Sequence, residues 1–206
     1  LAELIFSSFR TGTPWLPGPF SLANYINAYS EPQTYTIFAN TVLIALVATA
    51  ISIGVALFFA FLTERTDMPF RNLAWGLLLI PLAMPGILYA VAWTFLLTPR
   101  IGLFNIWLRG ALSWIGIDLT EGPFNIYSME GMIFLEGMRG VTTTFLIVVG
   151  AFRAMDPTLE EAARVSGASS LRTWLKVSFP LLTPAILAAT MYSFMSHLES
   201  LEIPII

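Results

Sequence analysis

Two carboxylates near the end of the chain are the first side chains that could do chemistry. Glu199 and Glu202 lie three residues apart, so a helix would place them on one face. Hard cations prefer oxygen ligands, and the pair could therefore line a cation pathway. The single histidine, His197, lies off that face, and we expect it to pack or to form hydrogen bonds. We predict a possible pathway at Glu199 and Glu202, and no resident metal site.

A second group of candidate residues lies between positions 153 and 183. Asp156 is a good cap for a helix that starts at Pro157. Proline suits the first helical position because the N–H that it lacks would have no partner within the helix there. Two glutamates, two alanines and a glycine follow: Glu160, Glu161, Ala162, Ala163 and Gly167. The glutamates suit the positive end of the helix dipole, the alanines leave a smooth surface, and the glycine can end the helix. These residues alone indicate an ordered loop that suits docking of a partner, or merely a well-capped surface hairpin.

A second short helix is expected after this glycine. It begins near Ser169 or Ser170 and is expected to end at Pro180, because proline breaks a helix interior. Thr183 and Pro184 then repeat the pattern of a cap followed by proline. We therefore predict that the next helix starts at Pro184.

Several kinds of chemistry are excluded by residues that the sequence lacks. The chain has no cysteine and one histidine, which excludes disulfides, iron–sulfur clusters, thiolate zinc sites and multi-histidine metal centres. The Gly-x4-Gly-Lys-Ser/Thr, Gly-x-Ser-x-Gly and His-Glu-x-x-His motifs do not occur. A net charge of −3 without basic runs argues against nucleic acid as a partner. No catalytic residue and no cofactor are predicted.

The elements that position the candidate residues follow from the low charge of the chain. Of its 206 residues, 56% are hydrophobic and 11% are charged, whereas an average soluble domain has about 25% charged residues. So few charges cannot cover the surface of a soluble fold of this length. The excess apolar surface has to face lipid.

Four apolar intervals predict four membrane helices, at residues 37–62, 73–98, 131–152 and 184–206. A bilayer core needs about 20 helical residues, and the first three intervals are long enough to cross it. The fourth runs off the end of the sequence, and residues 1–6 read like the tail of an earlier helix. We expect a fragment truncated at both ends. The predicted fold class is all-α, a polytopic membrane helix bundle.

The basic residues predict the orientation of these helices. Segments 63–72 and 153–183 together hold six of the ten Lys and Arg residues, which places both on the cytoplasmic side. The segment 99–130 is then external. Within it, residues 101–115 contain Phe104, Trp107 and Trp114, which is typical of an amphipathic helix in the membrane interface.

Small residues and prolines inside the helices indicate how the helices pack. Every fourth residue on one face of the first helix is small: Ala48, Ser52, Ala56 and Ala60. Such stripes let membrane helices approach closely, although alanine is also simply common there. Pro81 and Pro85 kink the second helix, either beside a pore or as prolines tolerated without a role in transport. Glu136 and Arg139 predict a local ion pair.

The position of the two outer glutamates leaves two interpretations open. Counted from Pro184 at 1.5 Å per residue, Glu199 and Glu202 lie about 22 and 27 Å along the helix, in the outer part of the membrane. There they could line a pathway, or they could snorkel at the interface or pair with arginine.

One spacing in the cytoplasmic segment is specific. It reads Glu161-Ala162-Ala163, three residues, Gly167, nine residues, Val177, one residue, Phe179 and Pro180. This resembles the EAA loop of ABC-importer permeases, which has Ile and Leu at the two apolar positions. Residues 19–29, 65–71, 156–161 and 197–204 are similar to the ferric-iron-type permeases of that family. The resemblance covers nearly the whole chain and is most specific from 153 to 204.

The resemblance implies a type I ABC-importer permease fold, with one transmembrane domain over residues 1–206 and the cytoplasmic coupling loop at 153–183. In such importers, a cytoplasmic ATPase dimer that binds ATP and Mg drives two permease units. The residues implied to dock that ATPase are Glu160, Glu161, Ala162, Ala163 and Gly167, with Glu161 facing a basic ATPase residue. The chain would be the first half of a duplicated permease in a prokaryotic inner membrane, supplied by an external substrate-binding protein. It would be a transport subunit, not an enzyme.

The substrate and the transport class have alternatives. Ferric iron is the substrate that the resemblance implies, while polyamines, thiamine and phosphonates are alternatives within the family. A secondary carrier or channel without an ATPase would use the intramembrane glutamates to couple ions. Such carriers are often built from inverted repeats, and no internal duplication is visible in the sequence. The spacing of the EAA loop favours the permease.

Overall fold

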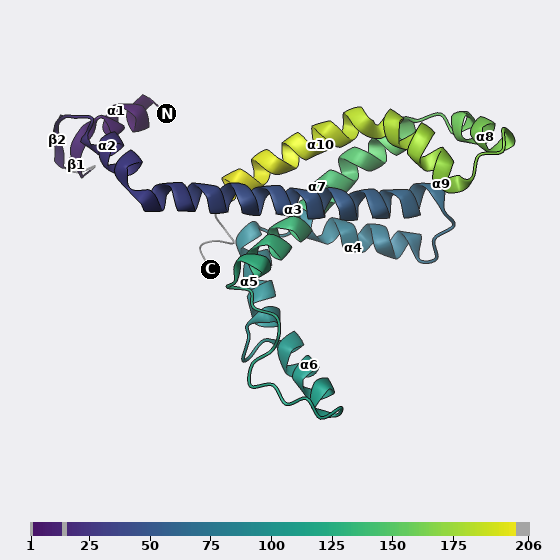
Figure 1. Cartoon of the computed structure of the whole chain (residues 1–206), viewed down its shortest axis with the longest axis horizontal. Coiled ribbons are helices and arrows are strands. Elements are labelled where there is room, and N and C mark those ends of the chain that lie inside the picture. Colours follow the sequence, from purple (N-terminus) through teal and green to yellow (C-terminus); the bar gives the residue numbers. More distant parts are fainter. Residues whose placement is uncertain (1, 14–15, 201–206) are drawn as a thin grey trace. The chain divides into compact units, whose positions relative to one another are not determined.

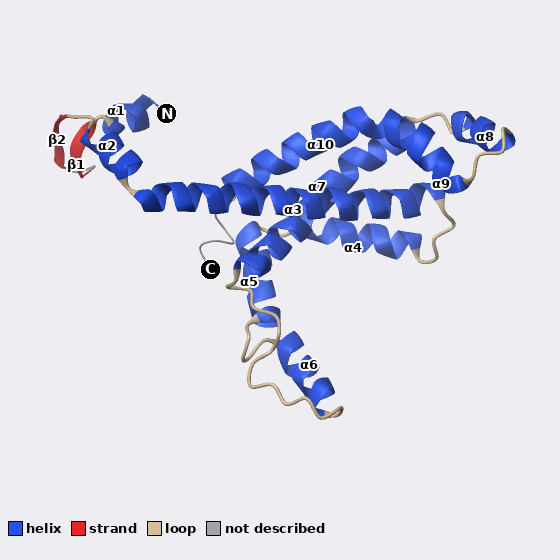
Figure 2. Ribbon diagram, in the orientation of Figure 1, coloured by secondary structure: helices blue, strands red, loops and turns tan. Residues whose placement is uncertain are grey.

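The computed structural model describes residues 2–13 and 16–200. Helices predominate in both compact units of the chain, residues 1–43 and residues 44–206 (Figure 2). The prediction of a single permease domain over residues 1–206 stays a prediction.

The first unit contains a small hairpin between short helices (Figure 1). Its elements are α1 (Ala2–Ser8), β1 (Arg10–Thr13), β2 (Leu16–Phe20), α2 (Ala23–Ser30) and the first turns of α3 (Pro32–Arg65). β1 and β2 are antiparallel, with Arg10 opposite Phe20. The Arg10 guanidinium lies 5.0 Å from the Phe6 ring centroid and 4.9 Å from that of Phe20. The helical pattern of the sequence did not predict this hairpin, where Gly12 has a positive φ of 114° that favours glycine.

The second unit is a bundle of helices that ends in the predicted cytoplasmic loop. After α3 its elements are α4 (Arg71–Ala83), α5 (Gly86–Leu97), α6 (Leu103–Ser113), α7 (Met129–Ala154), α8 (Thr158–Val165), α9 (Ser170–Thr173), the π-helical turn η1 (Trp174–Ser178) and α10 (Phe179–Glu199). Figure 1 shows α3, α7 and α10 running alongside one another, with α8 and α9 at one end. The main apolar core forms between these three long helices.

Small residues bring α3 and α7 close together. The predicted stripe on α3 is fully buried: Ala48, Ser52, Ala56 and Ala60. Opposite it, a Cβ added to Gly137 of α7 would lie 2.8 Å from Cγ2 of Ile51, which no side chain tolerates without movement. The predicted close packing is confirmed: the two backbones approach because the residues between them are small, and larger side chains would hold them farther apart.

The second predicted membrane helix is broken. Among the described residues, three helices are long and apolar enough to cross a membrane, at Pro32–Arg65, Met129–Ala154 and Trp174–Glu199. The pair α4 and α5 would be a fourth span, bent by 114°. A single kinked helix over 73–98 was therefore wrong. Met84 is extended, with φ −100° and ψ 130°, because the ring of Pro85 disfavours a helical conformation at the preceding residue.

The last helix begins earlier than its prolines suggest. Pro180 does not end a helix, and α10 starts at Phe179 instead of Pro184. In η1 the Phe179 N–H donates to the Trp174 carbonyl, five residues back. This wider turn gives the proline ring room, and proline is tolerated in the first turn of α10. Thr183 does not cap a helix, because its hydroxyl donates to the Phe179 carbonyl at 3.0 Å.

The predicted external segment contains the expected helix. α6 lies within residues 101–115, with Trp107 exposed. Its buried Asn105 donates to three carbonyl oxygens, those of Leu97, Thr98 and Phe124. Asn105 also accepts a bond from the Phe124 N–H at 3.1 Å. One side chain thus fixes α6 against the end of α5 and the loop that precedes α7.

Candidate functional site

The helix α8 (Thr158–Val165) of the predicted coupling loop begins one residue after the predicted Pro157 and ends just before Gly167, as predicted. The Thr158 N–H donates to Oδ1 of Asp156 at 2.9 Å, and hydrogen bonding from Thr158 holds the pKa of the Asp156 carboxyl below its ordinary value. At the other end Gly167 has φ 84°. The Ala168 N–H donates to the Ala163 carbonyl at 3.0 Å, the bond that typically closes a helix on a left-handed glycine.

The two adjacent glutamates of α8 face different surroundings. Glu160 is 6% exposed, and its Oε1 accepts hydrogen bonds from Arg65 Nε at 3.0 Å and from Ser178 Oγ at 2.7 Å. Glu161, by contrast, is exposed. The structure thus separates the predicted docking set. Glu160 holds α8 to the bundle, whereas Glu161, Ala162 and Gly167 are exposed and Ala163 is half-buried.

An apolar residue on the same helix is also exposed. The side chain of Val165 is 90% exposed beside the predicted docking residues. The sequence reasoning overlooked Val165, although a β-branched apolar residue in a short charged helix was a signal. A single exposed apolar side chain is common on protein surfaces, and Val165 is of interest only because it lies on α8 beside the predicted docking residues.

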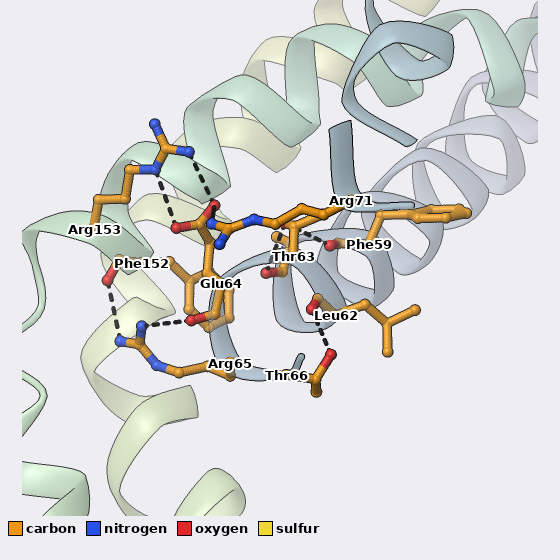
Figure 3. Close-up of polar contacts among 10 residues, drawn as sticks. Phe59, Leu62, Thr63, Glu64, Arg65, Thr66, Arg71, Phe152 and Arg153 are labelled. Atoms are coloured by element: carbon orange, nitrogen blue, oxygen red, sulfur yellow. Dashed lines mark hydrogen bonds and ion pairs between the residues drawn. The ribbon is translucent and has the colours of Figure 1, made fainter. Parts of the chain in front are cut away.

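A second carboxylate ties together the ends of three helices. Glu64, near the end of α3, accepts bonds from Nε and Nη2 of Arg153 in α7, at 3.1 Å and 3.0 Å. It also accepts a bond from Arg71, the first residue of α4, at 3.1 Å. Figure 3 shows both arginines converging on this carboxylate. The contacts place residues 63–72 and 153–183 at the same end of the bundle, as predicted, and the cytoplasmic location of that end stays a prediction.

Arg65 connects this region to the aromatic core. Its Nη2 donates to the Phe152 carbonyl at 3.1 Å (Figure 3). Its guanidinium lies 5.4 Å from the Phe152 ring centroid, and that ring stacks on Trp174 of η1. Arg65 of α3 therefore contacts α7 and α8 directly, and η1 through Phe152.

A buried polar cluster joins the long helices farther along the bundle. Glu136 and Arg139 form the predicted ion pair at 3.3 Å. Glu136 is buried, however, and it also accepts from Ser200 and contacts Nδ1 of His197 at 3.2 Å. Nε2 of His197 lies 3.2 Å from Ser52 Oγ. The prediction that His197 packs or hydrogen-bonds is confirmed. The pair is not merely local, since it joins α7 to α10, and His197 links both to α3.

A polar cavity lies beside the break between α4 and α5. Its volume is about 220 Å³, and its lining includes Pro81 and Gly86 at the break. Polar residues of α5, α7 and α10 complete the lining, among them Tyr89, Arg139, Thr142, Thr143, Tyr192 and Ser196. Hydroxyl groups and a guanidinium can bind hydroxylated or anionic groups. Of the two predicted kink prolines, Pro81 lines this cavity.

Only one residue of the predicted carboxylate pair lies within the described part of the chain. Glu199 is the exposed last residue of α10, and Glu202 lies outside the described residues. The pathway role of this pair stays a prediction. Within residues 2–13 and 16–200, no group of three or more His, Cys, Asp or Glu residues could hold a metal ion.

Sequence comparisons find relatives among transport-system permeases. The sn-glycerol-3-phosphate transport system permease protein UgpA of Yersinia pseudotuberculosis is 26% identical over 184 residues, which cover 88% of this chain and 61% of that protein. The sulfoquinovosyl glycerol transport system permease protein SmoH of Agrobacterium fabrum is 25% identical over 202 residues, covering 94% of this chain and 62% of that protein. The chain thus spans about three fifths of the length of these relatives. No protein-family model matches it.

Solved structures show the same fold. A bacterial ABC transporter involved in the import of the acidic polysaccharide alginate has a TM-score of 0.73 at 17% identity, over 96% of this chain and 67% of that chain. The same kind of transporter in complex with an alginate pentasaccharide-bound periplasmic protein has a TM-score of 0.65 at 16% identity, over 84% of this chain and 60% of that chain. The predicted polytopic bundle of the ABC-importer permease type is confirmed. The relatives named here are transport-system permeases, and they give no support to the ferric-iron type.

Proposed function

We propose that this chain is the membrane-spanning permease part of an ATP-driven importer in a prokaryotic inner membrane, with residues 63–72 and 153–183 in the cytoplasm. The observation that carries the proposal is the EAA spacing on α8, where Glu161, Ala162 and Gly167 are exposed while Glu160 anchors the helix. Homology to transport-system permeases over most of the chain supports it.

The partners follow from this role. A cytoplasmic ATPase dimer docks on Glu161, Ala162, Ala163 and Gly167, and it binds the ATP and Mg. A second permease unit completes the pathway, and an external binding protein delivers the substrate. The alginate transporter solved with a periplasmic protein supports the last of these partners.

The substrate class is a hydroxylated organic solute that carries negative charge. The names of the relatives and of the solved transporter point there, because glycerol phosphate, sulfoquinovosyl glycerol and alginate are all anionic and rich in hydroxyl groups. The cavity residues Arg139, Tyr192 and Ser196 suit such a solute. Ferric iron finds no support among the relatives, and neither do polyamines, thiamine, phosphonates or a carrier without an ATPase.

The docking role is tested by Glu161→Arg in the full-length protein, expressed with its ATPase. We expect the ATPase no longer to co-purify with this variant. The substitution replaces the carboxylate of Glu161 with a cation, which would repel the basic ATPase residue that it faces. Ser170→Arg is the matched control, since Ser170 is exposed on the same loop at a position that the motif leaves unspecified. Equal recovery of the ATPase with Glu161→Arg and the wild type would refute the docking role.

The substrate class is tested by uptake into cells that express the complete transporter. Labelled sn-glycerol-3-phosphate and ferric iron are the two probes. We expect uptake of the organic anion, reduced by Tyr192→Phe combined with Ser196→Ala, which removes two hydroxyls from the cavity. Uptake of ferric iron alone would overturn the proposed class.

A further inference from the structure

We propose that Glu160 is a positioning residue that transmits movement of α8 to the membrane helices through Arg65 and Ser178. The inference rests on the proposed docking of an ATPase on the same loop. It adds a second role within the EAA segment. Glu161 contacts the ATPase, and Glu160 transmits the movement of α8 to Arg65 and Ser178.

The first support is the geometry around one oxygen atom. Oε1 of Glu160 accepts from Arg65, 95 residues away at the end of α3, and from Ser178, 18 residues away in η1. Both members of the ion pair are shielded, with side-chain exposures of 15% for Arg65 and 8% for Glu160. Shielded charge-assisted bonds resist displacement by water. The first turn of α8 is therefore fixed to two other elements by its own side chain.

The second support is that Arg65 itself is fixed. Its guanidinium donates to the Phe152 carbonyl at the end of α7 and lies over the Phe152 ring. Phe152 stacks on Trp174, with centroids 5.6 Å apart, and Trp174 also contacts Phe61 of α3 at 5.0 Å. A displacement of Glu160 thus acts on a packed junction of α3, α7 and η1. A loop joined to the bundle by backbone alone would lack this connection.

The third support is that Glu160 and Glu161 are neighbours on a short helix. Successive residues of a helix differ by about 100° in direction, so that one turn presents one glutamate to the bundle and the other to the exterior. Gly167 and Asp156 close this helix at its two ends. α8 can therefore move as a rigid helix, so that a displacement caused by the docked ATPase reaches the junction of α3, α7 and η1.

The positioning role is tested in the complete transporter by the distance between spin labels at Asp67→Cys and Leu159→Cys. Both positions are exposed, and the 206 residues contain no other cysteine. We expect one narrow distance distribution in the unaltered junction. Glu160→Gln should add a second, longer population, because the neutral amide holds Arg65 weakly. Ser178→Ala is the milder variant if Glu160→Gln folds poorly, and it should broaden the distribution.

Transmission is tested by a second label pair on the membrane helices. Phe95 of α5 and Met191 of α10 are both exposed, and cysteines there report whether trapping the ATPase with ADP and vanadate moves these helices. We expect the trapped-state shift to be reduced or lost in Glu160→Gln while the ATPase still co-purifies. Glu160→Asp keeps the charge and should restore part of the shift. A merely structural role would not respond to charge in this way.

The outcomes separate the two proposals. Glu161→Gln is the matched control, one residue away, and should weaken ATPase association without changing the distance between the Asp67 and Leu159 labels. Unchanged label distances and an unchanged trapped-state shift in both Glu160→Gln and Ser178→Ala would overturn the positioning role. Failure of the docking proposal would instead appear as undisturbed ATPase association in the Glu161 variants.

Discussion

The ring of Phe152, at the end of α7, stacks on the ring of Trp174 in η1, with planes 6° apart and centroids 5.6 Å apart. Phe152 is fully buried, and the stack lies beside Arg65, whose guanidinium covers the same phenyl ring. This contact packs the end of α7 against the turn that leads into α10. Loss of this stack should therefore weaken the packing of α3, α7 and η1.

Phe152→Ala is expected to destabilise the full-length protein by about 3–5 kcal/mol, because it removes a buried ring and leaves a cavity. Thermal unfolding in detergent measures this loss. The control is Phe95→Ala on α5, where the residue is 70% exposed, and it should change stability little. Equal losses from both substitutions would contradict the packing role of Phe152.

Gly140→Ala is expected to destabilise the bundle by about 1–3 kcal/mol, the usual range for overpacking. An added Cβ would lie 2.8 Å from Cε1 of His197 and would also overlap the Ser52 hydroxyl. Gly150→Ala on the same helix is the matched control, because an added Cβ there meets nothing within 4 Å. It should be neutral or stabilising, since alanine favours a helix more than glycine does. Denaturation of both variants measures the difference, and the reverse order would refute the close approach.

Asn105→Ala is expected to loosen the external helix α6. The substitution leaves the carbonyls of Leu97, Thr98 and Phe124 without their side-chain donor, at a cost of about 1–3 kcal/mol for a buried unsatisfied group. Hydrogen exchange should show faster exchange across α6 while α7 keeps its protection. Ser113→Ala, an exposed position on α6, is the control. Unchanged exchange in Asn105→Ala would show that other contacts hold the segment.

The stabilisation of α8 by the Asp156 cap should decrease as the pH is lowered. Because the folded-state pKa of Asp156 is lowered, the ionised cap stabilises α8 above the ordinary pKa of aspartate, and this stabilisation is lost as pH falls through the lowered value. Protection factors of the α8 amides, corrected for intrinsic exchange rates, should fall in acid. In Asp156→Asn the amide oxygen can still accept from Thr158 without titrating, so that variant should lack this acid-dependent loss. The same acid-dependent loss in Asp156→Asn would assign it to another group.

The predicted coupling loop shows which structural features local sequence patterns can predict. The cap at Asp156 and the stop at Gly167 were predicted correctly, because each depends on residues a few positions apart. The inward direction of Glu160 was not predicted, since its partner Arg65 lies 95 residues away. The same reason explains the cluster of Glu136 and His197, which are 61 residues apart.

By itself, the sequence predicted the long apolar helices, the two segments 63–72 and 153–183 that share one end of the bundle, and the end of α8 at Gly167. Those properties follow from charge content, hydropathy and residue spacing along the chain. Only the tertiary structure decided that the second span breaks at Pro85, that α10 runs through Pro180, and which of two adjacent glutamates faces the bundle. The physical reason is that a wider turn, a bend or a buried ion pair is stabilised by contacts between distant helices. Such contacts leave no trace in local sequence patterns.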